Sequence, residues 1–263
     1  MTLAPEQVTA AILAGGAGRR MGGLDKGLMR RAGAPLVKTL IQQLQPDVCA
    51  LWLSIHRNVP AYQAVLDGIE PRPGQRMGVV TDATADYAGP MAGVRAVWKV
   101  CSTPYLLLVP GDAPGLPADF VQRMTQALTL QATRVVVAQV GQDRHYTACL
   151  LQRDALPLPP GRGSLRDWLS LTPVGTAPMP AATRLSINSP AEAADGGRTG
   201  AGCRHQGDRR GGGRRGCQSR TRSPQEWSRD SGATSGDVRA VRVSRACECN
   251  ARCWLPFLLY PKL

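Results

Sequence analysis

Short hydrophobic runs alternate with segments of helical periodicity along the first 195 residues. A run that ends abruptly at glycines, as Val8 to Ala14 ends at Gly15 and Gly16, is typical of a buried strand that enters a tight turn. The runs predict strands at Val8 to Ala14, Val48 to Ile55, Gly78 to Thr81, Tyr105 to Val109, Arg134 to Val140 and Ala148 to Leu151. Helical spacing predicts helices at Leu36 to Leu44, Ala92 to Val100 and Ala118 to Leu130. This alternation predicts an α/β domain with a mostly parallel, twisted sheet and helices on both of its faces.

The edge of this sheet where its strands end is the expected ligand site. In open α/β sheets, ligands bind beyond the carboxyl ends of the strands, where the strand order reverses. The residues that follow Leu13, Val80 and Val109 should therefore face the site. These residues form the densest polar and glycine-rich clusters of the chain.

Composition divides the chain near residue 195. Residues 1–195 hold 18 Lys+Arg and 14 Asp+Glu, a net +4, whereas residues 196–263 hold 14 and 5, a net +9 of the total +13. From residue 196 to about residue 241 no hydrophobic period is visible, so we predict a disordered, basic Gly/Arg/Cys-rich tail. We interpret this tail as a frameshifted read-through of GC-rich DNA. The predicted domains are thus residues 1–195 and 196–263, and the net charge says little about the first.

The N-terminus and the hydrophobic segments bear on the expected location. The opening MTLAPEQVTA has no basic region followed by a hydrophobic one, and no run of about 18 hydrophobic residues occurs. We expect a cytoplasmic protein that does not interact with membranes.

The first cluster, LAGGAGRRMGGLDKGL, begins at Leu13. Glycines after a strand let the backbone approach a phosphate and present its N–H groups, while Arg19 and Lys26 supply positive charge. This pattern predicts a polyphosphate site. Two familiar motifs do not fit, because Met21 occupies the place of the third glycine of a dinucleotide fingerprint and no P-loop string is present.

The second cluster, TDATADYAGPMAG, closes one predicted strand and opens a helix. Gly89 and Pro90 predict a sharp turn, and the N–H groups of the following helix start could receive an anionic or carbonyl oxygen.

The third cluster is YLLLVPGDAP, in which Asp112 emerges directly from a hydrophobic strand. A carboxylate at such a place needs a partner, and a divalent cation that bridges to phosphate oxygens is the natural one. The alternative is that Asp112 caps the helix that follows.

The first cluster resembles the signature of nucleotidyltransferases, and its GGLDKGL ending resembles the molybdenum cofactor guanylyltransferase family. The resemblance extends over residues 8–193 and implies a Rossmann-like nucleotidyltransferase fold. It implies a magnesium-dependent enzyme that transfers GMP from GTP to the terminal phosphate of molybdenum-molybdopterin, which yields the guanine dinucleotide cofactor and pyrophosphate. The pair Gly15–Gly16 favours GTP over CTP, since relatives that use CTP usually have a second alanine in place of Gly15.

Carried over position by position, the resemblance implies a set of site residues. The catalytic residues are Lys26, Arg19 and Asp112. The GTP contacts are Leu13, Ala14, Gly15, Gly16, Gly18, Arg19, Lys26, Ser54, Asp82, Gly89, Pro90 and Asp112. Magnesium is assigned to Asp112 and Asn188, and the pterin phosphate to Arg162 and Arg166. The chain departs from the family pattern at Ser54, Met91, Tyr146 and Ser186.

Two other functions stay open at this point. One is a related nucleotidyltransferase that uses CTP or a sugar phosphate. The other is an RNA-binding protein that acts through the Arg/Gly stretch at residues 209–215, although the aromatic residues that stack on bases are nearly absent there. For the guanylyltransferase, the expected partners are proteins that load molybdopterin and apo-molybdoenzymes, and we expect no nucleic-acid binding.

Overall fold

A computed structural model describes residues 3–16, 25–81 and 89–187. All of them lie in the first of the two units into which the chain divides, Met1–Cys203. The predicted tail lies outside the described residues. The main sheet contains β1 (Val8–Leu13), β4 (Ala50–Ile55), β5 (Arg76–Thr81), β6 (Tyr105–Pro110), β7 (Val135–Val140), β8 (Asp143–Gln152) and β9 (Val174–Met179). A small hairpin pairs β2 (Arg30–Arg31) with β3 (Ala34–Pro35).

The seven strands of the main sheet run in the order β5-β4-β1-β6-β8-β7-β9. Every neighbouring pair is parallel except the two that include β8, which runs antiparallel to both β6 and β7. The predicted mostly parallel α/β sheet is therefore confirmed. The chain leaves β1 toward β4 and β5 and later returns to β6 on the other side of β1, so the strand order reverses between β1 and β6.

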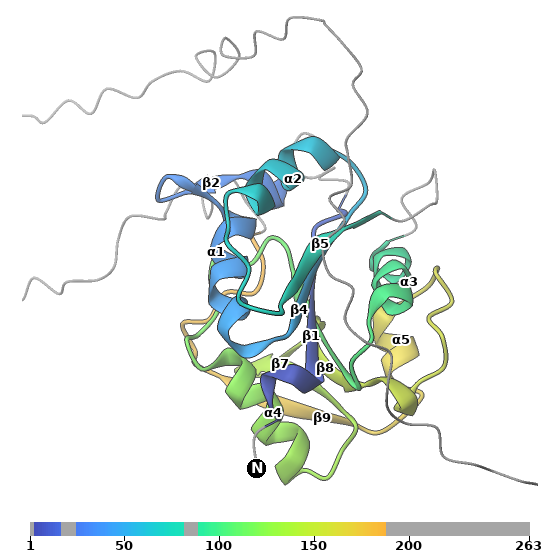
Figure 1. Ribbon diagram of the computed structural model, residues 1–263. Coiled ribbons are helices and arrows are strands. Elements are labelled where there is room, and N and C mark those ends of the chain that lie inside the picture. Colours follow the sequence, from blue (N-terminus) through green and yellow to red (C-terminus); the bar gives the residue numbers. More distant parts are fainter. Residues whose placement is uncertain (1–2, 17–24, 82–88, 188–263) are drawn as a thin grey trace, which may run out of the picture. The chain divides into compact units, whose positions relative to one another are not determined.

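Helices cover both faces of the sheet (Figure 1). The helices are α1 (Leu36–Leu44), α2 (Val59–Asp67), α3 (Pro90–Val100), α4 (Phe120–Leu130) and α5 (Leu165–Leu169), with 3-10 turns at Pro5–Gln7, Lys26–Leu28, Gln45–Asp47 and Arg153–Ala155. Buried side chains of α1, α2 and α4 share one hydrophobic core with one face of the strands. Those of α3 and α5 share a second core with the other face. Each helix thus buries one hydrophobic side against a strand layer that is itself hydrophobic on both faces.

The hydrophobic pattern locates most of these elements. The helix predicted at Leu36 to Leu44 coincides with α1, and the predicted strands lie on β1, β4, β5, β6, β7 and β8. The pattern does not reveal that β8 is antiparallel. It also misses α2 and β9. The strand β9 pairs only with β7 at the end of the sheet, where Pro178 is tolerated because its missing N–H is not needed for a second ladder.

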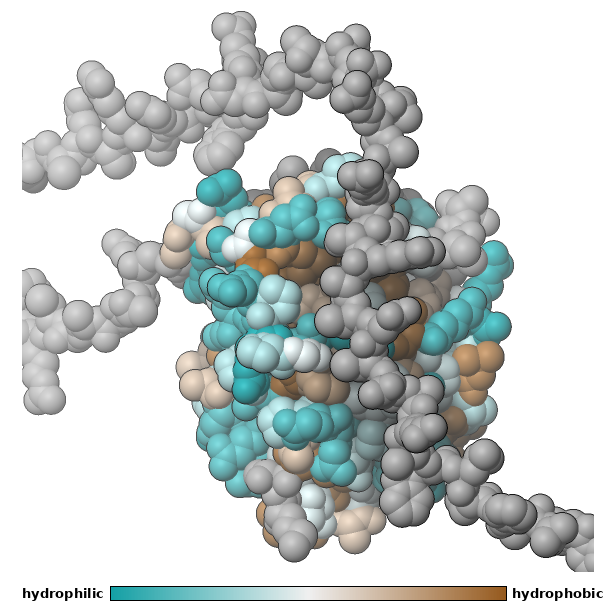
Figure 2. All heavy atoms as spheres, in the orientation of Figure 1, coloured by the Kyte–Doolittle hydropathy of each residue, from teal (hydrophilic) through white to brown (hydrophobic). Residues whose placement is uncertain are grey.

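The longest described helices, α3 and α4, have 11 residues each, so no helix in the described ranges could cross a bilayer. On the face drawn in Figure 2, hydrophilic and hydrophobic residues are interspersed.

Candidate active site

Lys26 and Asp112 meet where the strand order reverses. Asp112 follows β6, and Lys26 begins the 3-10 turn after the glycine-rich segment that follows β1. The Lys26 ammonium donates to Asp112 Oδ2 at 3.0 Å and to the Ile187 carbonyl oxygen at 2.6 Å. Their side chains are 25% and 21% exposed, so both charges are reachable from solvent. The structure therefore brings two of the three predicted catalytic residues into contact.

The close approach of β6 to β1 depends on Gly111. Its N–H donates to the Leu13 carbonyl oxygen at 2.9 Å, and a Cβ at this position would lie 2.8 Å from the Ala14 Cβ. Such a distance leaves no room for a side chain. Glycine before Asp112 thus lets this loop lie directly against Leu13 and Ala14, where the predicted phosphate loop begins.

Ser54 lies within the sheet at the same edge. It is paired in register with Leu13, and its carbonyl oxygen accepts from the Ala14 N–H at 2.8 Å. Its side chain is buried and faces Gly93 of α3, where a Cβ would collide with the Ser54 hydroxyl. In this structure the Ser54 hydroxyl therefore contacts α3, and the predicted GTP contact at this position stays a prediction.

The N-terminus of α3 forms as the sequence predicts. Gly89 precedes the helix with φ +78°, a backbone conformation that favours glycine, and Pro90 is the first helical residue. Arg95 on the same helix donates to the Pro159 carbonyl oxygen at 2.7 Å, and its Cδ would lie 3.0 Å from a Cβ at Gly161. The loop that carries Arg162 is thereby attached to α3.

Arg166 and Tyr146 come together although 20 positions separate them in the chain. The Arg166 guanidinium lies over the Tyr146 ring, 5.4 Å from its centroid. Tyr146 belongs to a bulge of β8, where Val137 pairs with Cys149 and the next residue of β7 pairs with His145. Since bulges redirect side chains, this irregularity accounts for the ring that supports Arg166.

Asp25 has several partners that sequence reasoning missed. Its carboxylate accepts from the Tyr62 hydroxyl at 2.5 Å and from the Asn58 amide at 2.9 Å, and the Arg57 Nε lies 4.0 Å away. The Asp25 side chain is 8% exposed and Tyr62 is fully buried. Burial and the hydrogen bond to Asp25 raise the pKa of Tyr62 far above its usual value. The only signal in the sequence is the position of Asp25 beside Lys26.

Asp112 suits a hard divalent cation, because it offers carboxylate oxygens at a partly exposed strand end. The alternative role of a helix cap does not hold, since Asp119 occupies the position before α4. In the part of the chain that the structure describes, no group of three His, Cys, Asp or Glu side chains forms a metal site. Four predicted site residues, Gly18, Arg19, Asp82 and Asn188, lie outside the described residues.

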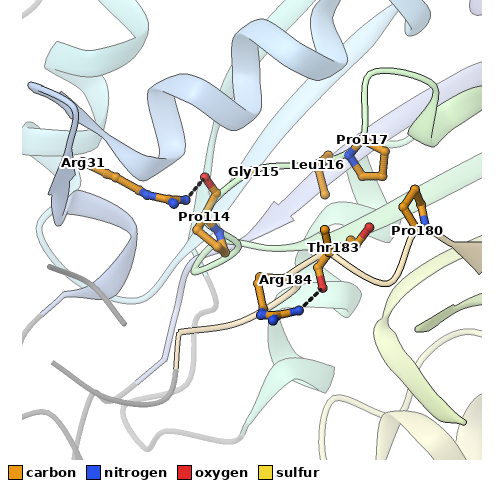
Figure 3. Close-up of a pocket in the computed structure, with 9 residues that line it drawn as sticks. Arg31, Pro114, Gly115, Leu116, Pro117, Pro180, Thr183 and Arg184 are labelled. Atoms are coloured by element: carbon orange, nitrogen blue, oxygen red, sulfur yellow. Dashed lines mark hydrogen bonds between the residues drawn. The ribbon is translucent and has the colours of Figure 1, made fainter. Parts of the chain in front are cut away.

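A pocket of about 310 Å³ lies beside the Asp112 loop. Figure 3 shows the Arg31 guanidinium reaching the Pro114 carbonyl oxygen, a hydrogen bond of 2.9 Å, and Arg184 near Thr183. The lining residues are Arg31, Pro114, Gly115, Leu116, Pro117, Pro180, Ala182, Thr183 and Arg184, and none of them is a predicted site residue. An antiparallel bridge between Gly115 and Arg184 guides the chain back toward Ile187, whose carbonyl oxygen binds Lys26.

The reversal of strand order between β1 and β6, with the Lys26–Asp112 ion pair beyond the carboxyl ends of these strands, is the arrangement of a doubly wound α/β protein. Residues 10–169 match the family model of the MobA-like NTP transferase domain, which covers more than half of the chain. The chain belongs to this family.

Curated relatives agree with the predicted resemblance. Over 135 residues, which are 51% of this chain and 63% of the relative, the chain is 38% identical to the "Molybdenum cofactor guanylyltransferase" of Cupriavidus taiwanensis. It is 35% identical over 173 residues, 62% of this chain and 83% of the relative, to the protein of the same name from Bordetella petrii. The chain thus spans less than two thirds of the length of the first relative. The resemblance to this family is confirmed.

Among solved structures, the fold is similar to that of "Molybdopterin-guanine dinucleotide biosynthesis protein A" from Archaeoglobus fulgidus. The TM-score is 0.54 at 13% identity, and the match covers 72% of this chain and 96% of the other. The predicted nucleotidyltransferase-like fold is thereby confirmed.

Proposed function

We propose that the chain transfers GMP from GTP to the terminal phosphate of molybdenum-molybdopterin. The observation that carries this proposal is the Lys26–Asp112 ion pair beside the glycine-rich segment, in a chain whose relatives bear the name of this activity. A phosphate oxygen of the pterin attacks the α-phosphorus of GTP, and the bond from that phosphorus to the bridging β-oxygen breaks. The products are molybdopterin guanine dinucleotide and pyrophosphate.

The attacking phosphate is already an anion, so the site has to align the reactants and neutralise charge rather than remove a proton. Lys26, together with Arg19, stabilises the charge that develops on the α-phosphate and on the leaving pyrophosphate. The N–H groups of residues 15–18 bind phosphate oxygens, while Ser54, Asp82, Gly89 and Pro90 border the nucleotide.

We assign the divalent cation, Mg²⁺, to Asp112 with Asn188. When bound, the cation neutralises phosphate charge and orients the triphosphate. The partly exposed carboxylate of Asp112 supports this assignment, because it can exchange its ammonium partner for a cation without moving out of a buried site.

The acceptor phosphate is assigned to Arg162 and Arg166. The contact of Arg166 with the Tyr146 ring supports this role, since it holds the guanidinium on one side and leaves its donors available. Arg162 also lies on the loop that Arg95 attaches to α3, and the helix α5 with Arg166 follows this loop.

Pyrophosphate release tests the proposed reaction. The purified chain is incubated with molybdenum-molybdopterin, MgCl₂ and GTP, and the dinucleotide product is identified by mass. The expected result is turnover with GTP that greatly exceeds turnover with CTP or UTP, and that stops when EDTA removes the cation. Preference for CTP, or turnover only with a sugar phosphate as acceptor, would replace this proposal by the related nucleotidyltransferase.

We further propose that residues 1–195 carry the activity and that residues 196–263 are dispensable for it. A chain ended after residue 195 should transfer GMP at the rate of the full chain. Loss of RNA retention on truncation, without any GMP transfer by either form, would favour the RNA-binding alternative. For an active enzyme, the acceptors of the product are apo-molybdoenzymes, and molybdopterin-loading proteins supply the substrate.

A further inference from the structure

Lys26 is flanked on both sides by contacts with one buried tyrosine. Asp25, the residue before it, accepts a 2.5 Å hydrogen bond from the Tyr62 hydroxyl. Gly27, the residue after it, is buried against the same side chain, and a Cβ at Gly27 would lie 2.5 Å from the Tyr62 oxygen. The backbone on either side of Lys26 is therefore fixed against Tyr62.

These contacts hold the segment around Lys26 in one place. A carboxylate that is 8% exposed needs donors for its oxygens, and here both oxygens have one, Tyr62 on Oδ1 and Asn58 on Oδ2. Both donors come from α2 and the residue before it, so a helix holds the carboxylate. The Tyr62 hydroxyl can donate near neutral pH, since a tyrosine is protonated there even at its usual pKa, and burial and the bond to Asp25 raise the pKa of Tyr62 further. Hydrogen bonds to an ionised carboxylate are stronger than neutral ones.

The carboxylates of Asp25 and Asp112 differ in whether their oxygens are available for a new ligand. Both Asp25 oxygens already accept from buried or nearby donors, whereas Asp112 is bound to a partly exposed lysine. Asp25 is therefore suited to hold the backbone beside Lys26 in place. Asp112 is suited to exchange its lysine partner for a ligand.

We propose that Tyr62 and Asp25 are positioning residues that fix the backbone of Lys26, so that its ammonium lies at the reacting phosphates. The inference deepens the proposed function, on which its kinetic part rests. With the backbone fixed at residues 25 and 27, the main motion left to Lys26 is rotation about its side-chain bonds. The Asp112 and Ile187 oxygens then hold its ammonium in one direction. Positioning of this kind matters because a displacement of about 1 Å can cost on the order of 10²-fold in rate.

The first test is the substitution Tyr62→Phe, which removes the hydroxyl and keeps the ring. The matched control is Thr103→Val, which removes a buried hydroxyl at the opposite ends of the strands. Turnover is measured per folded molecule, with the folded fraction from thermal unfolding. We expect kcat to fall roughly 10- to 100-fold in Tyr62→Phe, with KM for the pterin unchanged. We expect no change of kcat in the control. The proposal would be refuted if kcat fell equally in both variants, or if it fell in neither.

The second test asks whether Tyr62 acts through Lys26. In the Lys26→Ala background, Tyr62→Phe should cause no further fall in kcat, because the group that it positions is gone. If the two effects multiply, Tyr62 acts by another route and the proposal is wrong. Asn58→Gly offers a milder variant, since Asn58 has φ +57° and glycine keeps that conformation while the amide donor is lost. We expect an effect in the same direction but smaller.

The third test does not depend on the reaction. Lys26 and Lys99 are acetylated at low reagent concentration in the full chain, and their modification is compared by mass spectrometry. Lys99 on α3 is exposed and serves as the internal reference. In Tyr62→Phe, the rate at Lys26 relative to Lys99 should rise by about threefold or more, since local opening separates the amine from its Asp112 and Ile187 acceptors. In Thr103→Val the ratio should not change. An unchanged ratio in both variants would overturn the positioning role, even where the wild-type chain transfers GMP. A raised ratio in a chain without GMP transfer would refute the proposed function alone.

Discussion

Buried neutral hydrogen bonds lie at one end of strands β1 and β6, and a partly exposed ion pair lies at the other. At their amino ends, the Thr103 hydroxyl lies 2.8 Å from the Thr9 hydroxyl and 2.8 Å from the Tyr105 carbonyl oxygen, and both threonines are buried. At their carboxyl ends, Lys26 and Asp112 form a partly exposed ion pair. One end satisfies its polar groups internally, and the other keeps two opposite charges within reach of solvent.

This difference separates the groups that stabilise the sheet from those assigned to the proposed activity. A buried neutral hydrogen bond contributes to folding and offers nothing to a ligand. A partly exposed ion pair contributes little to folding because water and salt screen it, yet each partner can be taken over by a ligand. Substitutions at the two ends should therefore affect different measurements.

The largest effect is expected from Asp112→Ala. GMP transfer should fall by about 10³-fold or more, because the proposed cation loses its carboxylate. The midpoint of thermal unfolding should change little, and Asp119→Ala, at an exposed carboxylate paired with Arg123, serves as the control. Unchanged turnover in Asp112→Ala would exclude Asp112 from the reaction.

Lys26→Ala should lower kcat by about 10²-fold and raise KM for GTP, because the side chain proposed to neutralise the phosphates is removed. Steady-state kinetics of pyrophosphate release measures both constants, and Lys99→Ala is the matched lysine control. A change confined to the unfolding midpoint would make Lys26 a structural residue.

Gly111→Ala tests the contact between the two strand ends. A Cβ here would lie 2.8 Å from the Ala14 Cβ and 2.9 Å from the Leu13 oxygen, so the loop has to shift. We expect a loss of about 2 kcal/mol in the free energy of unfolding, together with reduced turnover. Gly115→Ala in the same loop meets no atom within 4 Å and should be neutral in urea titrations. Equal stability of the two variants would contradict the described packing.

The smallest effect is expected at the amino ends. Thr103→Val should cost about 1 kcal/mol of unfolding free energy, since it leaves the Tyr105 carbonyl and the Thr9 hydroxyl without this partner. Turnover per folded molecule should stay at the wild-type value. A fall in kcat would show that the two ends of the strands are not independent.

Much of the fold could be predicted because a strand buried on both faces is hydrophobic throughout, as Leu106 to Val109 are. The helix α1 was predictable for a similar reason, since its hydrophobic positions face one core. The direction of β8 could not be predicted, because a hydrophobic run has the same pattern in a parallel and in an antiparallel strand. The helix α2 escaped notice because only Tyr62 and Leu66 of its nine residues are buried.

The candidate site residues that the sequence indicates lie directly after a strand or in the segment that follows one. Asp112 stands out as a charge that follows a hydrophobic run, and Lys26 as a cation in a glycine-rich segment. The pairing of Asp25 with Tyr62 spans 37 positions and depends on how α2 packs, so no local pattern reveals it. The contact of Arg166 with Tyr146 is likewise a product of the bulge in β8.

In the proposed reaction, the ion pair of Lys26 and Asp112 also links the binding of the two proposed ligands, the triphosphate and the cation. Each residue is the counter-ion of the other, so a triphosphate that takes Lys26 frees Asp112, and a cation that takes Asp112 frees Lys26. The free energy needed to separate Lys26 from Asp112 is then required only once when both ligands bind. The binding of either ligand therefore favours the binding of the other. Because such coupling is reciprocal, nucleotide should raise the affinity for the cation by the same factor as the cation raises that for nucleotide.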